Sequence, residues 1–522
     1  MNLSGIVKKI FSPYVLSNEE KEFIKLNRIV WNTKCKGSVG VLVEGFLDSP
    51  TSVVEKSRLA NAAREVTGLD VEVIVRGVFG KASNVIPIYK SFGFDRFRLW
   101  WRNYFNPFVV IPAFSSFFHL LFMIRTGDAL VDYKKDDIVI GDLIYDSLIR
   151  NIPNSYTVKN ICIFKHGRIL LRSMFFFYGN KRILKNKNVK FFVTSHNVYA
   201  EYGMLCRQAH NQGAIVLLKD MDVYKIYSKS KNVNEHFLKV EQSIVDECVR
   251  TSDLKKEKEY YRSRVLGLSE QVDIKNAYKN KKIYSKSETL ALHTNFSLSK
   301  KNVFVMAHAF SDAPHVGEGL LFRDYYDFLE KTLIKLNGNS NINCFVKAHP
   351  SSYMWGEKGG VEEIVETNCL TNVCIVPSDY NTSSIIDVAD VIVTAKGTAG
   401  LEFSCAGIPA ITAGIGYYHG FGICYEPNTV ADYYSFLMNS HQLNKLDDSV
   451  INKSLIVLYQ SFNRLFHSPV LPAVQIRPGD DYQSLYRSKY SEMVTNLNAN
   501  ILMKDEFYDL VKSDISRVVD EE

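Results

Sequence analysis

A lysine, a threonine, two glycines and a glutamate follow one predicted strand at a spacing that can bind a phosphate. The strand is predicted over Val391–Thr394, and the chain continues Ala-Lys-Gly-Thr-Ala-Gly-Leu-Glu. Because a helix is predicted to start near Thr398, backbone N–H groups and the positive end of a helix dipole would lie at the carboxyl end of the strand. The candidate donor-binding residues of this motif are Lys396, Gly397, Thr398, Gly400 and Glu402.

Each residue type in this motif has a physical use. Gly397 and Gly400 permit a tight turn and a close approach of the backbone. Thr398 can cap the helix or hydrogen-bond a phosphate, and Glu402 could accept hydrogen bonds from ribose or sugar hydroxyls. The motif is neither the dinucleotide fingerprint nor a Walker loop. The alternative is an ordinary strand–turn–helix in which Glu402 is an acid at a helix start.

A second candidate phosphate element reads Lys347-Ala348-His349-Pro350 and ends a strand predicted over Ile342–Val346. Lys347 offers a positive charge and His349 offers ring N–H donors for a diphosphate or phosphodiester oxygen. Pro350 restricts His349 to an extended conformation, which fixes its direction. A lone histidine can equally be structural, but two phosphate elements in one region favour a ligand.

Residues 307–315 follow a strand predicted over Asn302–Met306 and read Ala-His-Ala-Phe-Ser-Asp-Ala-Pro-His. Because they leave the first strand of a second α/β region, we expect them to face the space between two domains. His308 and Asp312 could orient a donor or an acceptor. The alternative is a loop of polar residues without a role in chemistry.

The first half of the chain carries acids and a histidine at predicted strand exits. Glu44, Asp142, Asp146 and His196 are of the types that can accept the proton of an acceptor hydroxyl or stabilise a developing cation. The sequence does not choose among them, and each could be structural or position a substrate.

Metal-binding signals are weak. The chain has no H-E-x-x-H motif and no close cluster of cysteines and histidines. Asp220-Met221-Asp222 has the spacing of an acidic metal pair but is interpreted as a polar loop. We therefore expect no metal and no other cofactor.

Alternating strand and helix patterns predict an α/β fold with parallel sheets, and 522 residues are too many for one core. The predicted parts are an N-terminal α/β domain over 1–230 and a basic inter-domain region over 231–295. A C-terminal α/β domain over 296–470 and a helical tail over 471–522 follow. The tail could cross back onto the N-terminal domain.

The chain resembles bacterial capsule polysaccharide biosynthesis proteins in four places taken together. These are Lys347–Pro350, Asp379, Val393–Glu402 and Gly407–Pro409. Those proteins are similar to the Kdo transferases of capsule assembly. More distantly, they resemble polysialyltransferases and the CDP-glycerol glycerophosphotransferases of wall polymers. All are similar to GT-B glycosyltransferases. The resemblance is specific over roughly 300–425.

The resemblance implies a GT-B-like fold, with two Rossmann-like domains whose parallel sheets face a central cleft. It implies a metal-independent glycosyltransferase that binds a nucleotide-sugar donor, CMP-linked by preference, on the C-terminal domain. It also implies that His349 contacts the donor phosphate and that Gly397, Thr398 and Glu402 line the nucleotide site. By the same resemblance, the expected acceptor is a growing polysaccharide or a glycolipid, and it binds the N-terminal domain.

Three other functions stay open. A CDP-alditol phosphotransferase would use the same phosphate elements. A degenerate, non-catalytic partner would bind polysaccharide without a nucleotide. A sugar epimerase of similar fold would release a free or isomerised sugar and elongate no acceptor.

Composition limits the partners and the compartment. The net charge of +7 is mild and does not imply nucleic acid. Nine cysteines, an odd number without a C-x-x-C pair, favour reduced thiols in a cytoplasm. Residues 255–286 hold ten Lys/Arg and four Asp/Glu, a pattern typical of a solvated linker or helix face, with an anionic membrane surface as the alternative.

The apolar segment Phe108–Ile124 follows a basic, aromatic stretch that begins at Arg96. We expect a buried core helix there. Attachment to a membrane surface through 96–124 and a true membrane span are the alternatives. The expected location is the cytoplasm, with peripheral attachment at the inner face of the cytoplasmic membrane left open.

Overall fold

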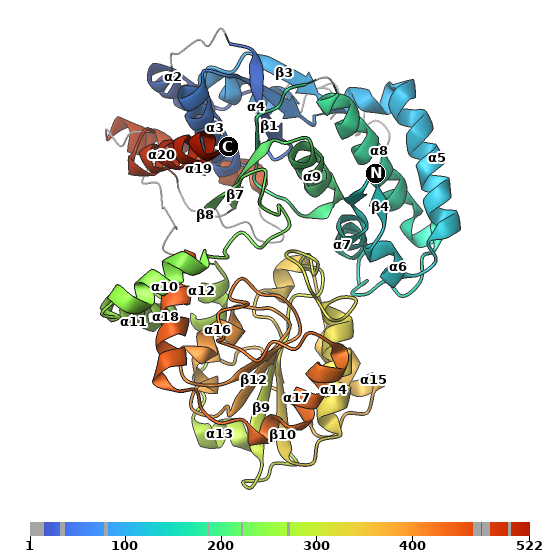
Figure 1. Cartoon of the computed structure of the whole chain (residues 1–522), viewed down its shortest axis with the longest axis vertical. Helices are drawn as coiled ribbons and strands as arrows, with labels where there is room; N and C mark the ends of the chain where they lie inside the picture. Colours follow the sequence, from blue (N-terminus) through green and yellow to red (C-terminus); the bar gives the residue numbers. More distant parts are fainter. Residues whose placement is uncertain are drawn as a thin grey trace.

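Two α/β domains, each built around its own sheet, lie one above the other in Figure 1. The structure is a computed structural model that describes residues 15–31, 37–77, 82–185, 187–220, 223–268, 272–462, 471, 481–499 and 503–522. The six-stranded sheet has the order β3-β2-β1-β6-β7-β8, and the five-stranded sheet has the order β11-β10-β9-β12-β13.

The N-terminal sheet is parallel except for its last strand, β8, which runs antiparallel to β7. Its strands are β1 (Val39–Gly45), β2 (Asp70–Val75), β3 (Arg96–Leu99), β6 (Phe191–Thr194), β7 (Ile215–Asp220) and β8 (Val223–Tyr227).

Both faces of this sheet are covered, as its runs of valine and isoleucine require. Leu42 and Ile74 point into a core shared with α5, α7, α8 and α9, whereas Val41 and Val73 point into a core shared with α2, α3 and α4. The helices of this domain are α2 (Asn18–Val30), α3 (Pro50–Thr67), α4 (Ala82–Ser91), α5 (Pro107–Met123), α6 (Gly127–Val131), α7 (Gly141–Asn151), α8 (Ile163–Leu184) and α9 (Met204–Asn211), together with a 3-10 helix (Trp100–Phe105) and a π-helix (Tyr199–Gly203).

One predicted strand exit is wrong. The residues interpreted as a sheet strand over Asp137–Val139 belong to a two-stranded antiparallel hairpin, β4 (Lys134–Lys135) with β5 (Ile138–Val139). Asp142 and Asp146 therefore lie on helix α7 and not at the end of a sheet strand. The short apolar run Ile138–Ile140 was ambiguous, because such a run fits a hairpin as well as a sheet strand.

The C-terminal sheet is wholly parallel. Its strands are β9 (Lys301–Met306), β10 (Ile342–Lys347), β11 (Val373–Ile375), β12 (Val391–Thr394) and β13 (Ala410–Thr412). Alternate residues again enter two cores: Val303 and Val393 lie in one, and Phe304 and Ile392 lie in the other. The fold is therefore the predicted GT-B-like pair of Rossmann-like domains.

The helices of the C-terminal half surround this sheet. They are α14 (Tyr325–Asn337), α15 (Gly360–Thr367), α16 (Ala399–Ser404), α17 (Val430–Met438) and α18 (Asp448–Phe462), with 3-10 helices over Ser352–Trp355, Thr382–Ile385 and Ser440–Gln442. The predicted inter-domain region contains α10 (Gln242–Thr251), α11 (Lys255–Val265), α12 (Val272–Tyr278) and α13 (Lys286–Ala291). Helix α18 packs against α10 and α11, so much of this region is attached to the C-terminal domain.

The last two helices, α19 (Tyr482–Asn498) and α20 (Glu506–Glu521), lie on the N-terminal domain against α2 and α3, as Figure 1 shows. Tyr490, Met493 and Phe507 enter the same core as Val41. Arg58 of α3, fully buried, forms an ion pair with Asp505 and donates to the carbonyl of Met503. The end of the chain thus completes the first domain.

Candidate functional site

Three chemically active side chains follow neighbouring strands of the C-terminal sheet. His308 comes after β9, His349 after β10 and Lys396 after β12, and these strands are adjacent in the order β10-β9-β12. Because parallel strands end at one edge of a sheet, the three predicted motifs meet there. His349 and Lys396 lie close enough to His308 for their charges to lower its pKa.

His308 is held in one orientation. Its ring stacks on Tyr325 with ring centroids 4.1 Å apart. Its Nε2 accepts a hydrogen bond from the backbone N–H of Lys396 at 3.3 Å and lies 3.3 Å from Oγ1 of Thr394. Burial, then His349 and Lys396, hold the pKa of His308 well below its ordinary value. The ring is therefore neutral at pH 7 and ties the β9 loop to the β12 loop.

The two glycines of the β12 motif lie in close contact with other side chains of the protein. A Cβ on Gly397 would lie 3.1 Å from ring atoms of His308, and a Cβ on Gly400 would lie 2.4 Å from the hydroxyl of Tyr418. That hydroxyl donates to the carbonyl of Gly397 at 2.7 Å. Close approach explains both glycines, although the partner in each case is a side chain of this chain.

His349 lies at the turn after β10 and is partly exposed. Its Nδ1 accepts a hydrogen bond from the backbone N–H of Ser351 at 3.2 Å. A neutral ring that accepts at Nδ1 carries its proton on Nε2, which is then the donor that a phosphate oxygen needs. Pro350, also half-buried, follows directly.

Lys396 is buried, and its ammonium reaches toward the other domain. Nζ donates to the carbonyl of Val316 at 2.6 Å. Burial lowers the pKa of Lys396 to about 8, and Asp146 and Asp142 of the N-terminal domain oppose that effect. The cation therefore lies where the two domains meet.

Lys347 does not reach the edge where His308 and His349 lie. As the last residue of β10 it is buried, and its Nζ donates to the carbonyl of Tyr380 at 2.9 Å. Burial lowers its pKa to about 8. The alternation of β10 turns its side chain toward the core face that holds Phe345 and Tyr380. The phosphate contact of Lys347 stays a prediction, and it would require Nζ to leave the carbonyl of Tyr380.

Glu402 is engaged inside the C-terminal domain. Its Oε1 accepts from Nη2 of Arg264 at 2.5 Å and from Nε at 3.1 Å, and its Oε2 lies 3.3 Å from the hydroxyl of Tyr278. Arg264 is almost fully buried and lies over the ring of Phe462. The carboxylate thus joins α16 to α11 and α12, and a contact with ribose would have to compete with this ion pair.

Helix α16 begins at Ala399, in agreement with the predicted start near Thr398, and has six residues. Thr398 stands at its N-cap position with helical dihedral angles, and its side chain makes no cap hydrogen bond. The predicted capping role of Thr398 is therefore wrong, and a helix this short contributes little dipole.

The shortlisted acids of the N-terminal domain are bound to basic groups. Glu44, at the end of β1, is fully buried and accepts from Nζ of Lys56 at 3.0 Å. Asp142 accepts two hydrogen bonds from Arg207, at 2.7 and 2.6 Å. Asp146 pairs with His315 of the other domain.

His196 is in a different position. It follows β6, is half-buried, and its Nδ1 lies 3.1 Å from the hydroxyl of Ser195. Its ring lies beside Tyr202 with centroids 5.2 Å apart. Of the four shortlisted residues, His196 alone has no ion pair among the contacts of the described residues.

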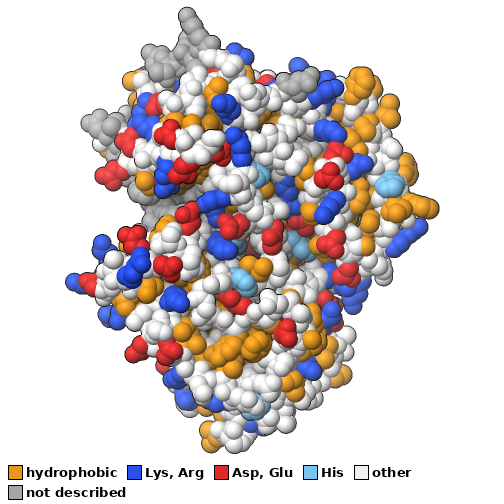
Figure 2. All heavy atoms as spheres, viewed as in Figure 1, with side chains coloured by type: hydrophobic (Ala, Val, Ile, Leu, Met, Phe, Trp, Pro, Cys, Tyr) orange, Lys and Arg blue, Asp and Glu red, His pale blue; other side chains and the backbone are white. Residues whose placement is uncertain are grey.

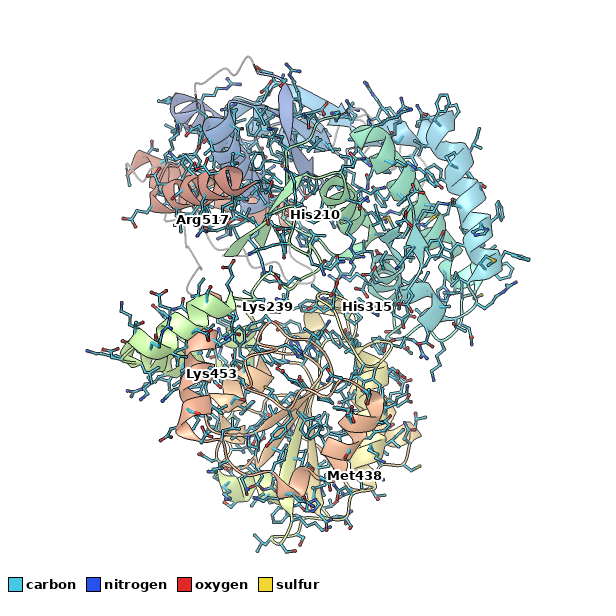
Figure 3. The ribbon with its side chains drawn as sticks, viewed as in Figure 1. His210, Lys239, His315, Met438, Lys453 and Arg517 are labelled. Carbon is cyan, nitrogen blue, oxygen red and sulfur yellow. The ribbon has the colours of Figure 1, made fainter. Side chains whose placement is uncertain are left out.

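Asp146 and His315 join the two domains, and Figure 3 shows His315 where the domains meet. Oδ1 of Asp146 lies 2.5 Å from Nδ1 of His315, while Nε2 of His315 lies 2.9 Å from the carbonyl of Arg323. Burial opposes the charged form of His315, but Asp146 and then Asp142 outweigh it and raise the pKa. Burial raises the pKa of Asp146, and His315 opposes that shift.

Several further contacts cross the same junction. Tyr145 donates to Asp324 at 2.5 Å, and Arg323 makes two hydrogen bonds to Asp128 at 2.8 and 2.9 Å. Tyr199, which follows β6, has its hydroxyl 3.4 Å from the carbonyl of Ser311, which follows β9. The carboxyl ends of both sheets therefore meet at this junction.

Tyr199 is a residue that the sequence did not single out. It has a φ of 57° and opens a one-turn π-helix. A tyrosine in the left-handed region is strained, and such strain and π-turns gather at functional sites. Exposed Asp312 acts on both Tyr199 and Tyr325 by its charge, so this predicted residue also belongs to the junction.

His236 and Arg150 were missed as well. His236, in the predicted inter-domain region, is half-buried, and desolvation, then Lys396, lowers its pKa to about 3. Arg150 lies over the ring of Trp355 across the junction. Neither residue belongs to a motif, because the fold brings each to the site from a distant part of the sequence.

Within the described residues, no group of three or more His, Cys, Asp or Glu side chains is placed to hold a metal ion. Two residues of the sequence's one acidic candidate, 221 and 222, lie outside the described residues. Metal independence therefore stays a prediction.

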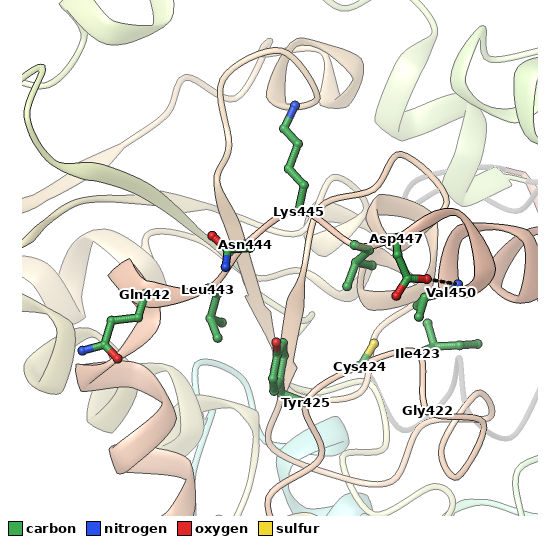
Figure 4. Close-up of a pocket in the computed structure, with 11 residues that line it drawn as sticks. Gly422, Ile423, Cys424, Tyr425, Gln442, Leu443, Asn444, Lys445, Asp447 and Val450 are labelled. Carbon is green, nitrogen blue, oxygen red and sulfur yellow. Dashed lines mark hydrogen bonds between the residues drawn. The ribbon is translucent and has the colours of Figure 1, made fainter.

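A pocket of about 370 Å³ lies elsewhere, beside β13 and the start of α18, as Figure 4 shows. It is lined by Gly422, Ile423, Cys424, Tyr425, Gln442, Leu443, Asn444, Lys445, Leu446, Asp447 and Val450. Asp447 accepts from the backbone N–H groups of Ser449 and Val450, both at 3.0 Å. With its carboxylate occupied and no histidine in the lining, this pocket offers less chemistry than the domain junction.

Residues 212–451 match the family described as capsule polysaccharide biosynthesis protein. The match is confined to this region of the chain. It spans the strands β9–β13 and all three motifs at their ends, and it covers a little under half of the chain. No curated protein matches the chain at a significant level.

Solved structures similar to the chain include sugar-processing proteins. Thermosulfurimonas dismutans KpsC, a beta Kdo 2,4 transferase, is 9% identical with a TM-score of 0.29, over 52% of this chain and 80% of that one. The UDP-GlcNAc 2-epimerase of Neisseria meningitidis is 7% identical with a TM-score of 0.24, over 82% and 100%. WaaG, a glycosyltransferase of lipopolysaccharide biosynthesis, is 11% identical with a TM-score of 0.23, over 87% and 99%. Such low scores say nothing of this chain's own activity.

Proposed function

We propose that this capsule-synthesis protein is a glycosyltransferase. It would transfer a sugar from a nucleotide-activated donor to a growing capsule or other surface polysaccharide, or to a glycolipid acceptor. The observation that carries the proposal is the meeting of His308, His349 and Lys396 behind three adjacent strands, at the edge where an α/β sheet binds ligands. A CMP-sugar such as CMP-Kdo is the favoured donor, from the sequence resemblance.

In this proposal the donor phosphates lie against His349, whose Nε2–H donates to a phosphate oxygen. Neutral His308 does not add a charge. It holds the backbone of the β12 loop through the N–H of Lys396, so that the N–H groups of that loop keep one direction. Such preorganised donors stabilise the negative charge that develops on the leaving phosphate. No metal is assigned a role.

Buried Lys396 supplies the nearby positive charge. Its Nζ is bound to the carbonyl of Val316 in the described conformation. A phosphate would compete well for this ammonium, because a hydrogen bond between two charged groups is stronger than one to a neutral carbonyl. We therefore assign Lys396 to the donor and not to the acceptor.

On the acceptor side we propose His196 as the group that takes the proton of the acceptor hydroxyl. Glu44 and Asp142 are held by Lys56 and Arg207, and Asp146 is held by His315. His196 follows β6 in the same loop as Tyr199, which contacts the β9 loop. Histidine is the side chain that most often acts as a general acid or base in enzymes.

A nucleotide-binding panel tests the donor site. Calorimetry with CMP, CDP, UDP and GDP should show one preferred nucleotide. His349→Ala should lose at least about tenfold in affinity, since a charge-assisted hydrogen bond contributes roughly 1.5–3 kcal/mol. His441→Ala, at a histidine of the 3-10 helix Ser440–Gln442, is the matched control. Near-normal transfer by a folded His349→Ala protein would reject the role of His349.

The alternatives are separated by product. A CDP-alditol phosphotransferase would transfer an alditol phosphate when CMP-sugars and CDP-alditols are assayed side by side. An epimerase would release a sugar without extending an acceptor. A non-catalytic partner would bind polysaccharide and no nucleotide. The proposal keeps the reaction in the cytoplasm, as the sequence predicts.

A further inference from the structure

Helix α5 (Pro107–Met123) is apolar on both of its faces. One face enters the core of the N-terminal domain and packs on α8: Val109, Ala113, Ser116, Phe117 and Leu120 are buried there. The predicted core helix is therefore only half right, because the opposite face is exposed. The exposed side chains are Phe108 (86%), Ile111 (69%), Phe114 (40%), Phe118 (60%), Phe122 (73%) and Met123 (58%).

The exposed face extends beyond α5, and we call the whole area the apolar face. Phe105 is 78% exposed just before the helix, and Ile163 and Phe164 at the start of α8 are 48% and 98% exposed. Figure 2 shows hydrophobic side chains along the right-hand edge of the molecule, where Figure 1 places α5. A contiguous apolar area of this kind marks a binding surface.

The two chain segments that carry the apolar face are basic. Neither 96–125 nor 159–185 contains an aspartate or a glutamate. Exposed Arg125 follows α5, and Lys159, Lys165 and Arg168 are exposed around the start of α8. Aromatic and aliphatic side chains bordered by lysine and arginine are the composition of segments that lie in a membrane interface.

A pocket adjoins the first turn of α5. It has a volume of about 360 Å³, and its lining includes Arg98, Arg102, Asn106 and Arg182. Asn106 is the N-cap residue of α5. Glu72, also in the lining, is engaged by Arg98 and Lys187. Arg102 and Arg182 are exposed, so the pocket presents guanidinium groups next to the apolar face.

We propose that the apolar face docks on the surface of an anionic phospholipid bilayer, with the arginine pocket on lipid phosphates. The apolar side chains would enter the acyl boundary, and guanidinium groups bind phosphate with two parallel hydrogen bonds. Helix α5 would lie in the plane of the membrane, because its other face is packed along α8. None of the helices in the described ranges is long and apolar enough to cross a membrane.

The basic border favours lipid over another protein copy. A second copy would bring its own basic border against the first, and like charges would oppose each other around a self-complementary patch. An anionic bilayer complements both features at once. This inference stands independently of the proposed glycosyl transfer.

Helix α8 connects the apolar face to the strand ends of the N-terminal sheet. Phe164 lies in the apolar face, and Arg172, eight residues later and about 12 Å along the helix, pairs with Glu201. Glu201 also pairs with Arg76, the residue after β2. A bilayer that held α5 would thereby hold the acceptor side of the protein at a fixed distance from the membrane.

Vesicle flotation of the full chain tests the inference. Wild-type protein should bind vesicles of phosphatidylcholine with phosphatidylglycerol, and binding should weaken on pure phosphatidylcholine and at high salt. Phe118→Ser with Phe122→Ser should reduce binding at least tenfold. Ile283→Ser with Leu298→Ser, at sites 69% and 89% exposed elsewhere, is the matched control and should bind as wild type does.

A second flotation experiment compares two double variants that reverse charges. Arg102→Glu with Arg182→Glu should lose the preference for phosphatidylglycerol. Lys256→Glu with Lys258→Glu makes the same charge change on exposed residues of α11, in the other predicted membrane segment, and should keep that preference. Thermal unfolding of each variant checks that it is folded.

Three results would overturn the inference. The first is wild-type protein that does not bind anionic vesicles. The second is a Phe118→Ser, Phe122→Ser variant that binds them as tightly as wild type. The third is a dimer in sedimentation that the same variant converts to a monomer, because the apolar face would then be a contact between copies of the chain.

Discussion

Oδ1 of Asp146 lies 2.5 Å from Nδ1 of His315, and the bond joins the two domains. Asp146 is on α7 of the N-terminal domain, and His315 is in the loop after β9. Both side chains are buried, and Lys396 and Asp142 act on the pair by their charges. The pair lies beside the cation that we assign to the donor, so it connects domain contact with the site.

His315→Gln should make the domain junction less stable at low pH. The pKa of His315 is raised in the folded protein, because the Asp146 bond outweighs burial. A raised histidine pKa gives stability that is complete below the unfolded value of about 6.5 and is lost as the pH rises through the folded value. We expect the free energy of unfolding of wild type to exceed that of the variant by about 3 kcal/mol below the unfolded pKa. The difference should become smaller as the pH rises through the folded pKa.

Thermal unfolding of both proteins across this pH range measures the difference. His441→Gln should show no such trend. A gap between wild type and His315→Gln that widens as the pH rises would contradict the assignment.

Glu402→Gln should destabilise the C-terminal domain. Arg264 is almost fully buried against Phe462, and Glu402 is its carboxylate partner. Removing one member of a buried ion pair leaves an uncompensated charge and costs about 3 kcal/mol. Urea unfolding measures this loss, with exposed Glu362→Gln of α15 as the control. Unchanged stability together with lost nucleotide affinity would instead support the ribose contact that the sequence predicts.

Gly400→Ala should also destabilise, for a steric reason. The new Cβ would lie 2.4 Å from the Tyr418 hydroxyl, and overpacking of this kind costs roughly 1–3 kcal/mol. Adding Tyr418→Phe removes the clashing oxygen and should recover part of the loss. Gly338→Ala, where the nearest atom is 3.5 Å away, is the control. If Tyr418→Phe gave no recovery in Gly400→Ala, the clash would not be the cause.

His196→Ala should slow sugar transfer without weakening the binding of the nucleotide donor. Removal of a general base lowers the rate roughly 10²–10⁴-fold, whereas we assign the nucleotide to the other domain. Single-turnover transfer and calorimetry on the same preparation separate the two effects. Glu44→Gln is the comparison, since it leaves Lys56 buried without its partner and should act on stability. Normal turnover by His196→Ala would remove His196 from the mechanism.

Local patterns predicted the sheet strands well, because a buried parallel strand is a short run of Val, Ile and Phe with a polar exit. The strands β9, β10 and β12 lie within one residue of the predicted bounds. The prediction failed at the hairpin β4–β5, because a run as short as Ile138–Ile140 fits a hairpin as well as a buried sheet strand. Helix α5 was half right, because its composition is apolar on both faces and does not say which face is covered.

The sequence by itself determined that His308, His349 and Lys396 would each follow a strand of the C-terminal α/β region. Only the tertiary structure decided that these three strands are adjacent, and which of the candidate side chains already have a partner. Lys347 bonds to Tyr380, Glu402 pairs with Arg264, and Asp146 pairs with His315. These partners are 33, 138 and 169 residues apart. The physical reason is that packing, and not local spacing, brings a polar side chain to its partner. A residue's type therefore limits the chemistry that it could do, and its neighbours in the fold decide whether the side chain is available for that chemistry.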